Sequence, residues 1–404
     1  MALTPEQLEK VPDNIVKLYE ELETFIIQDI SRRIAKVGQI SDTAQWQYIR
    51  AQEFGMAEET LKKKIAATLN LTLAEVDKLF EDSATKSINS DNVLFEQAKL
   101  TAMHIESSPE LKAYLIAAIK QTKSELSNMC QSLGFVKFNG SKTINKSLTA
   151  YYREVLDLAN MQVTSGILDY NKAIRNAVKN LSKSGVRVIS YESGWNNRAD
   201  VAVRRAVLTG VNQMSIKMTD HNMNTLIPKD EQYVEVSAHM GARPSHQTWQ
   251  GRVYKVEGST SGYPNLYEVT GLGTGDGLCG WGCRHSYFPF IPSISARTYT
   301  DEKLNNIDPK PFEYKGKMYT YYQATQRQRE IERAIRQTKR EIIGYQAAGL
   351  DTDFKNSSIL LQRQKEEYKT FSNAAGIRIK LDRQQILGFN KSISQKSRYA
   401  RSKE

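Results

Sequence analysis

Cysteine, histidine and long apolar stretches are scarce in this chain of 404 residues. Three cysteines cannot form a disulfide framework, and an odd number favours a reducing compartment or metal ligation. The longest apolar run, residues 113–119, is far shorter than the roughly 20 residues that a membrane-spanning helix needs. Charged residues such as Glu6, Glu9 and Lys10 occupy the first segment, so we expect no secretory signal peptide. The sequence therefore predicts neither a membrane span nor signal-dependent secretion.

The composition is that of a globular protein with an ordinary core. Hydrophobic residues make up 40% of the chain and charged residues 25%, which excludes global disorder. At this length the chain can bury a core without disulfide bonds, and two or three domains are expected.

The positive charge is concentrated at the carboxyl end. The net charge is +11, and residues 301–404 contain 22 Lys and Arg against 13 Asp and Glu, a balance of +9. Such a basic segment suggests a polyanionic neighbour, either nucleic acid or an acidic protein surface. A solvated helical surface that happens to be basic is the alternative.

Proline and glycine divide the chain into regions of different architecture. Seven of the ten prolines and ten of the 23 glycines fall between residues 228 and 311, and these residues interrupt helices. We predict an α+β protein that is mainly helical, with a small β-rich central domain and a C-terminal helical hairpin. The expected regions are a helical part over 1–227, a β-rich core over 228–300, a basic helical hairpin over 301–390, and a basic flexible tail over 391–404.

Local signals place several elements within these regions. Helix starts are expected at two capping boxes, Thr4 to Gln7 and Thr72 to Glu75, and at Ser108-Pro109. One long helix is expected over 148–184, ending at Gly185, and the hairpin is expected to turn near Gly349. Alternating polar and apolar residues predict strands over 233–237, 252–256 and 266–270.

A cluster of cysteine and histidine in the β-rich region is the best candidate for a metal site. Cys283 and His285 lie close together near residue 280, and His239 and His246 lie upstream, so two segments could converge on one tetrahedral zinc. These four residues are the predicted zinc ligands, with Cys279 as a substitute. The alternatives are ordinary buried side chains, or a nucleophile pair of Cys283 and His246.

Basic residues near the carboxyl end are candidates for contact with phosphates. The predicted DNA contacts are Lys391, Lys396, Arg398, Arg401 and Lys403. Further cations are expected on the outward faces of the first hairpin helix: Arg327, Arg329, Arg333, Arg336, Lys339 and Arg340. No sequence-reading motif accompanies them, so binding to double-stranded DNA would be non-specific.

Two blocks of the central region carry a resemblance to a known family. Residues 233–251, YVEVSAHMGARPSHQTWQG, and residues 263–292, YPNLYEVTGLGTGDGLCGWGCRHSYFPFIP, resemble hallmark blocks of the phage minor capsid protein 2 family. This family is similar to the head-morphogenesis proteins of tailed phages typified by the Mu F protein. The positions that correspond to the hallmark residues are His239, Arg243, Ser245, His246, Trp249, Cys283, Arg284 and His285.

The resemblance implies a virion protein present in few copies near the portal, made in the host cytoplasm and built into the capsid. It implies portal and capsid proteins as partners, roles in packaging or ejection of DNA, and no enzymatic activity. Two other classes stay open from the residues alone. A metal-dependent hydrolase or nuclease would use the central Cys/His cluster, and a host-side DNA-binding protein would not associate with capsids.

Overall fold

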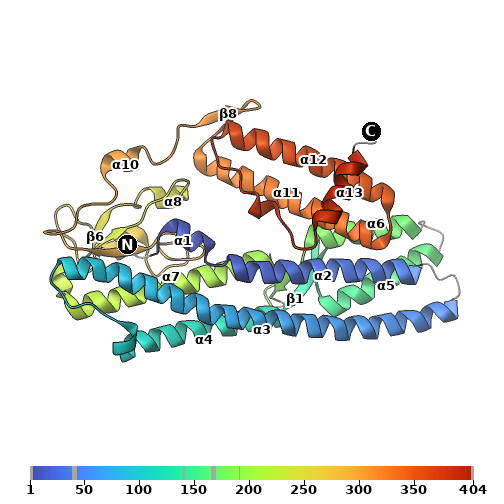
Figure 1. Ribbon diagram of the computed structural model, residues 1–404, viewed down its shortest axis with the longest axis horizontal. Helices are drawn as coiled ribbons and strands as arrows, with labels where there is room; N and C mark the ends of the chain where they lie inside the picture. The colour runs from blue at the N-terminus through green and yellow to red at the C-terminus, as the bar shows by residue number, and fades with distance from the viewer. Residues whose placement is uncertain (1–2, 39–42, 140–141, 165–169, 191, 402–404) are drawn as a thin grey trace. The chain divides into compact units, whose positions relative to one another are not determined.

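The computed structural model describes residues 3–38, 43–139, 142–164, 170–190 and 192–401 (Figure 1). Helices account for 65% of the described residues and strands for 10%. The protein is therefore a mainly helical α+β protein, as the distribution of proline and glycine predicts.

Contacts along the chain define two compact units, each assembled from three separate segments. Unit 1 contains Met1–Ile15, Thr72–Leu126 and Val203–Thr325, and unit 2 contains Val16–Leu71, Ser127–Ala202 and Gln326–Glu404. Each unit draws on several of the four consecutive regions that the composition predicts. The division of the chain into those four regions stays a prediction.

The α-helices are α1 (Pro5–Lys10), α2 (Asp13–Gly38), α3 (Thr43–Gln97), α4 (Pro109–Gln131), α5 (Leu148–Thr164), α6 (Tyr170–Ser184), α7 (Ala199–Leu226), α8 (Pro244–Gln247), α9 (Leu266–Thr270), α10 (Asp301–Asn305), α11 (Tyr321–Ala348), α12 (Asp351–Ala374) and α13 (Lys391–Arg401). The strands are β1 (Leu133–Asn139), β2 (Lys142–Ser147), β3 (Arg187–Ile189), β4 (Asn196–Arg198), β5 (Tyr233–Val236), β6 (Val253–Lys255), β7 (Tyr287–Phe290), β8 (Phe312–Tyr314) and β9 (Lys317–Tyr319). Short 3₁₀ turns span Ile105–Ser107, Lys229–Glu231 and Asp382–Gln384.

Several predicted helix ends are confirmed. Thr4 caps α1, since its hydroxyl accepts a hydrogen bond from the Gln7 amide and the Gln7 side chain accepts one from the Thr4 amide. The Ser108 hydroxyl accepts from the Leu111 amide at the start of α4. Gly185, after α6, has a φ of +61°, the left-handed conformation that glycine adopts at least cost.

One predicted helix start is wrong, and one predicted helix lies only partly within the described residues. Thr72 does not begin a helix, because α3 runs without a break through it and the residue is fully buried. Good helix-forming residues on both sides of residue 72 outweigh the local capping signal. The single helix predicted over 148–184 corresponds to α5 and α6, and residues 165–169 between them lie outside the described part of the chain.

The β-rich part of unit 1 is a three-stranded antiparallel sheet in the order β6-β5-β7. Its core residues include Val234, Trp249, Tyr254 and Tyr287. The Glu235 carboxylate on the central strand is fully buried and accepts hydrogen bonds from the backbone amides of residues 298 and 299, each at 3.0 Å. These two amides compensate the cost of burying the charge.

The predicted strand over 266–270 is instead the short helix α9. The Asn265 side chain accepts from the Glu268 amide at 3.0 Å, and Gly271 ends the helix in the left-handed conformation with a φ of +64°. An alternating pattern of five residues is too short to distinguish strand from helix, and here the two caps decide.

Unit 2 contains a four-stranded antiparallel sheet in the order β2-β1-β3-β4, which the sequence analysis did not predict within the helical region. It also contains the predicted helical hairpin, formed by α11 and α12 (Figure 1). Gly349, with a φ of +71°, lies in the turn as expected. Ile335, Ile342, Leu361 and Phe371 are fully buried on these two helices.

The cations of α11 do not all point outward, and the prediction is wrong for Arg336, Lys339 and Arg340. Lys339 and Arg340 are buried, and the Arg336 side chain is only 15% exposed. Arg340 forms an ion pair with Glu23 at 2.5 Å, and Arg336 lies 3.8 Å from Asp200, all within unit 2. Buried carboxylates need compensating charges, and arginine supplies them with several donors in a fixed geometry.

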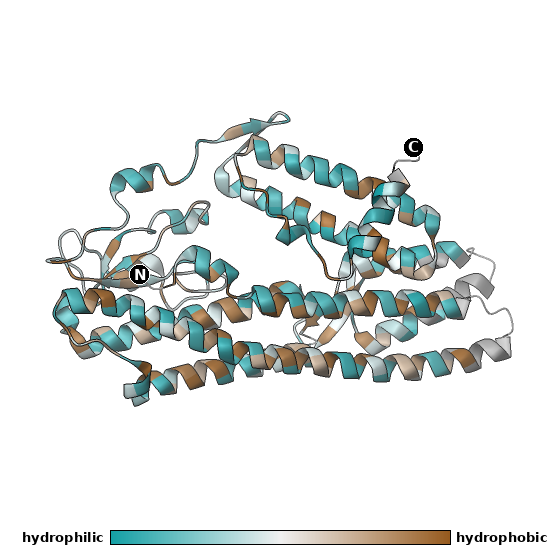
Figure 2. Cartoon of the chain, in the orientation of Figure 1, coloured by the Kyte–Doolittle hydropathy of each residue, from teal (hydrophilic) through white to brown (hydrophobic). Residues whose placement is uncertain are grey.

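Apolar residues are interspersed with polar ones along the helices (Figure 2). Among the described residues, no helix combines the length and the apolarity needed to cross a bilayer.

Candidate metal centre and basic helix

The central Cys/His residues are held in unit 1 by a short helix and a tight turn. Pro244 opens α8, a position where its fixed φ suits a helix, and α8 carries His246. Cys279 and Gly282 both adopt positive φ, at +61° and +64°, and fold residues 279–285 into the turn that leads to β7. Both elements therefore direct their side chains into the same core.

Three of the four predicted zinc ligands come together. The Nδ1 atoms of His246 and His285 are 3.4 Å apart, and the Cys283 Sγ lies 3.8 Å from the first and 3.5 Å from the second. All three side chains are buried, with exposures of 2%, 1% and 3% for His246, His285 and Cys283. The three donor atoms thus form a compact triangle out of contact with solvent.

The outer nitrogen of each imidazole has its own acceptor. His246 Nε2 lies 2.9 Å from the Asp276 carbonyl oxygen, and His285 Nε2 lies 3.1 Å from the Gln250 Oε1. That Gln250 oxygen also accepts the backbone N–H of His239 at 3.1 Å, which fixes which end of the amide is oxygen. Both imidazoles therefore donate from Nε2, and in their neutral forms both Nδ1 atoms carry a lone pair.

Burial determines the protonation of the three groups. It lowers the pKa of His246 and lowers that of His285 far below the usual value, with neighbouring cationic and imidazole groups adding to the second effect. Burial also raises the pKa of the Cys283 thiol. Without a bound cation, the cluster consists of two neutral imidazoles and a neutral thiol.

His239, the fourth predicted ligand, belongs to the surroundings of the cluster. Its ring stacks on that of His285 with centroids 4.4 Å apart. Its Nδ1 lies 2.9 Å from the Met240 carbonyl oxygen and 3.2 Å from Arg284 Nη2. His239 is therefore not among the three converging donors. The substitute, Cys279, is part of the hydrophobic core, and its thiol donates to the His285 carbonyl at 3.4 Å.

Sequence reasoning missed two residues that position the cluster. Gln250 orients His285, as described above. Asn212 on α7 donates its side-chain amide to the His285 carbonyl at 2.9 Å and to the Cys283 carbonyl at 3.4 Å. Gln250 stands within a quoted hallmark block, so its position was available as a signal. Asn212 lies about 70 residues from the turn, and no local pattern indicates it.

The turn is also tied to the first helix of unit 1. Arg284 Nη1 pairs with Glu9 on α1 at 2.9 Å, and the Ser286 hydroxyl donates to the Leu3 carbonyl at 2.9 Å. The segment that carries Cys283 and His285 is consequently held by α7 through Asn212, and by the amino-terminal segment through Arg284 and Ser286.

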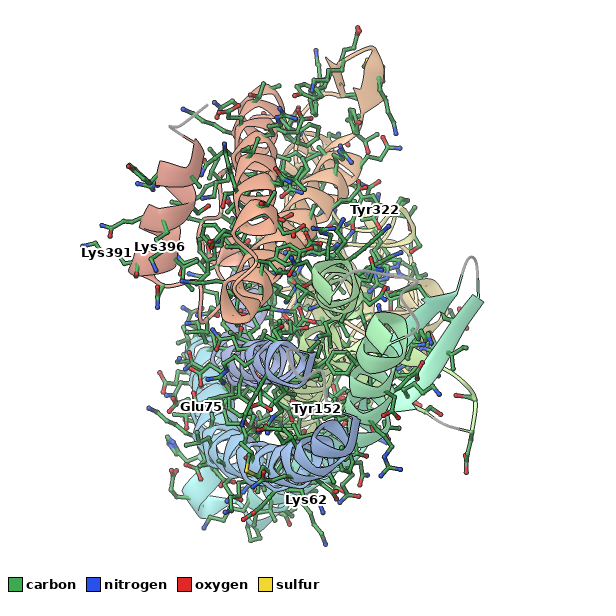
Figure 3. All side chains as sticks on the ribbon, turned by 90° about the vertical axis from the view of Figure 1, so that its right-hand side faces the viewer. Lys62, Glu75, Tyr152, Tyr322, Lys391 and Lys396 are labelled. Carbon is green, nitrogen blue, oxygen red and sulfur yellow. The ribbon has the colours of Figure 1, made fainter. Side chains whose placement is uncertain are left out.

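Four of the five predicted DNA contacts lie on α13, where the sequence predicts a flexible tail. Lys391, Lys396 and Arg398 are exposed on this helix, and Figure 3 shows both lysines on its side that faces away from α11 and α12. Arg401 is the last residue of α13, and Lys403 lies outside the described residues. The charge of Arg398 adds to burial in lowering the pKa of Lys365 on α12, so the two cations are electrostatic neighbours.

Comparison with known proteins gives the chain its class. The family model that matches describes a structural protein of the phage head. It is the model of phage minor capsid protein 2, and it matches residues 3–373, nearly the whole sequence. The chain belongs to this family, and its role is that of a structural protein of the virion. The match includes both hallmark blocks and the Cys/His cluster. No curated protein and no solved structure matches the chain significantly.

Proposed function

We propose that this protein is a low-copy component of the phage head, located at the portal vertex and in contact with packaged DNA. Its membership of a minor capsid protein family is the observation that carries the proposal. An icosahedral shell repeats each surface site many times by symmetry, so a protein present in few copies needs a site that is not repeated. The portal vertex is such a site in a tailed phage.

The cationic face of α13 supports the DNA contact. Its exposed cations are held on an ordered helix whose other face, with Ile393 and Ser397, is buried in unit 2. Fixed cations neutralise phosphates without reading bases. This arrangement suits DNA of any sequence, which is what a packaged genome presents.

We also propose that the protein acts by binding rather than by catalysis. The alternative, a metal-dependent hydrolase or nuclease, is not favoured, because the one cluster of three metal-ligating side chains among the described residues is fully buried and contains no carboxylate. Hydrolysis at a metal requires an open position that the substrate can reach. The Cys283 and His246 pair is equally enclosed, and the raised pKa of the thiol opposes a nucleophilic role.

Heads assembled with and without the portal protein test the proposed location. In a strain that lacks only the portal gene, we expect purified heads to contain at least tenfold less of this chain per major capsid protein than heads from the parent strain. Resupplying the portal protein should restore the amount.

A second measurement applies to intact heads. Lysine cross-linking followed by mass spectrometry should join this chain to the portal protein. Equal amounts in heads with and without portal, together with cross-links only to the major capsid protein, would contradict the proposed location.

A further inference from the structure

The geometry points to a zinc ion bound by His246 Nδ1, His285 Nδ1 and Cys283 Sγ in unit 1, with a water molecule as fourth ligand. This site is independent of the proposed location in the head. It differs from the sequence-based hypothesis in its ligands, because His239 and Cys279 are not among them.

The separations of the three donor atoms are those that tetrahedral zinc requires. Zinc binds imidazole nitrogen at about 2.0–2.1 Å and thiolate sulfur at about 2.3 Å, which in a regular tetrahedron places two nitrogens about 3.4 Å apart and sulfur about 3.6 Å from each nitrogen. The observed separations are 3.4 Å between the nitrogens, and 3.5 and 3.8 Å from sulfur to nitrogen. The three donor atoms therefore already lie at the separations that one tetrahedrally coordinated zinc ion requires.

Without a bound cation, the hydrogen-bond acceptors of this cluster lack enough donors. Because both imidazoles donate from Nε2, the lone pairs of the two Nδ1 atoms face each other at 3.4 Å in a buried site. The thiol of Cys283 has one proton and can satisfy only one of them. An unpaired buried acceptor costs free energy, and a bound cation removes that cost for both nitrogens at once.

The surroundings have the organisation that accompanies metal-binding histidines. Such histidines usually donate their other ring N–H to a carbonyl or carboxylate, which fixes the tautomer and the orientation of the ring. Here the Asp276 carbonyl and Gln250 Oε1 accept those protons. Asn212 holds the backbone carbonyls of Cys283 and His285, so the turn is fixed independently of the metal.

The donor set selects zinc over the hard cations. Two imidazoles and one thiolate suit zinc, whereas magnesium and calcium bind oxygen ligands, and no carboxylate belongs to this cluster. Binding deprotonates Cys283, and the released proton passes to solvent. Because α8 and the turn before β7 both supply ligands, the ion should join them and add to the stability of unit 1.

The test uses the full-length protein, purified without chelators, and matched cysteine variants. Elemental analysis should find about one zinc per chain in the wild type and in Cys279→Ser and Cys130→Ser, and less than a tenth of that in Cys283→Ser. Cys130 is a suitable control because it is buried in unit 2 and hydrogen-bonded to Tyr19.

Cobalt substitution keeps the test valid if Cys283→Ser does not fold. The wild type and Cys279→Ser, loaded with Co²⁺, should both show near-ultraviolet absorption from a single cobalt–thiolate bond and visible bands of tetrahedral intensity. A strong chelator should remove the ion and lower the melting temperature. A folded wild type that holds no zinc, gives no such spectrum and melts at the same temperature with and without chelator would overturn the site. Loss of the ion from folded Cys279→Ser would overturn the ligand assignment.

Discussion

At the scale of single residues, Asp91 on α3 is a buried carboxylic acid in unit 1. Its Oδ2 accepts a hydrogen bond from the Thr219 hydroxyl at 2.6 Å, and the residue is 1% exposed. Burial raises the pKa of Asp91 to about 7 from its ordinary value of 3.8. The folded protein therefore binds a proton here that the unfolded chain releases near pH 4.

A group with a raised pKa in the folded state stabilises the protein fully below its unfolded pKa and loses that effect as the pH rises to the folded pKa. For Asp91 this loss extends from about pH 4 to about pH 7. Asparagine has nearly the same shape and cannot ionise. We expect the Asp91→Asn variant to gain stability relative to the wild type between pH 5 and pH 8, on the order of 2 kcal/mol, since each tenfold change in an acid constant is worth about 1.4 kcal/mol.

Denaturant unfolding of both proteins at a series of pH values measures this gain. The exposed Asp82 on the same helix, changed to asparagine, is the matched control for the substitution itself. Parallel pH profiles for Asp91→Asn and the wild type would show that Asp91 does not carry the proton.

At the same scale, the candidate site shows what residue types can predict. Rare Cys and His residues in one region indicated His246, Cys283 and His285 as candidate ligands, because few other residue types can ligate zinc. The position of His239 could not be predicted, since its ring stacks on His285 and turns its Nδ1 toward Met240. Such details depend on packing across the sheet and the turn, which spacing along the chain does not contain.

At the scale of elements, α13 shows how a basic segment can become ordered. The Asn390 side chain accepts the Ile393 amide at 2.9 Å and caps the helix, and Ile393 and Ser397, four residues apart, form its buried stripe. The density of charge in this segment suggested a flexible tail. The Asn390 cap and the burial of Ile393 and Ser397 outweigh that signal, because α13 packs against α12.

Part of the positive charge of residues 301–404 compensates acidic residues inside unit 2. Arg336 and Arg340 compensate Asp200 and Glu23, which belong to the earlier part of the chain. Charge counts along the sequence cannot reveal this, because the acids lie more than 130 residues away. The cations available to DNA are therefore better sought on α13 than on α11.

Substitution is a cleaner test of α13 than truncation, which would also uncover the part of α12 that α13 contacts. We expect the triple variant Lys391→Gln, Lys396→Gln, Arg398→Gln to reduce the slope of log affinity against log salt for duplex DNA. Each lost phosphate contact removes about 0.9 from that slope, so the reduction should reach about 2.7 at most.

The matched control removes three exposed lysines of unit 1, Lys78, Lys86 and Lys120, and should leave the slope unchanged. Titration of one duplex at several salt concentrations measures all three proteins. An unchanged slope in the α13 variant would exclude this helix from DNA binding and favour an acidic protein as its partner.

At the scale of the whole molecule, composition predicted the class of fold but not the assembly of the units. The scarcity of proline and glycine outside residues 228–311 predicted mainly helical flanks, and these are present. Each compact unit combines segments separated by more than 50 residues. Contacts at such separations leave no periodic signal along the chain. The small sheet of unit 2 lies within one of these segments and was not expected for a different reason, because strands as short as β3 and β4, with three residues each, carry too little alternation to be distinguished from their helical surroundings.

The central claim is that this protein is built into phage heads in few copies. Quantitative mass spectrometry of gradient-purified heads, set against the lysate from which they came, tests that claim most directly. We predict that the chain co-purifies with heads at a few per cent or less of the molar amount of the major capsid protein, constant through successive purification steps. Normal abundance in the lysate with none in the heads, or an amount equal to that of the major capsid protein, would contradict it.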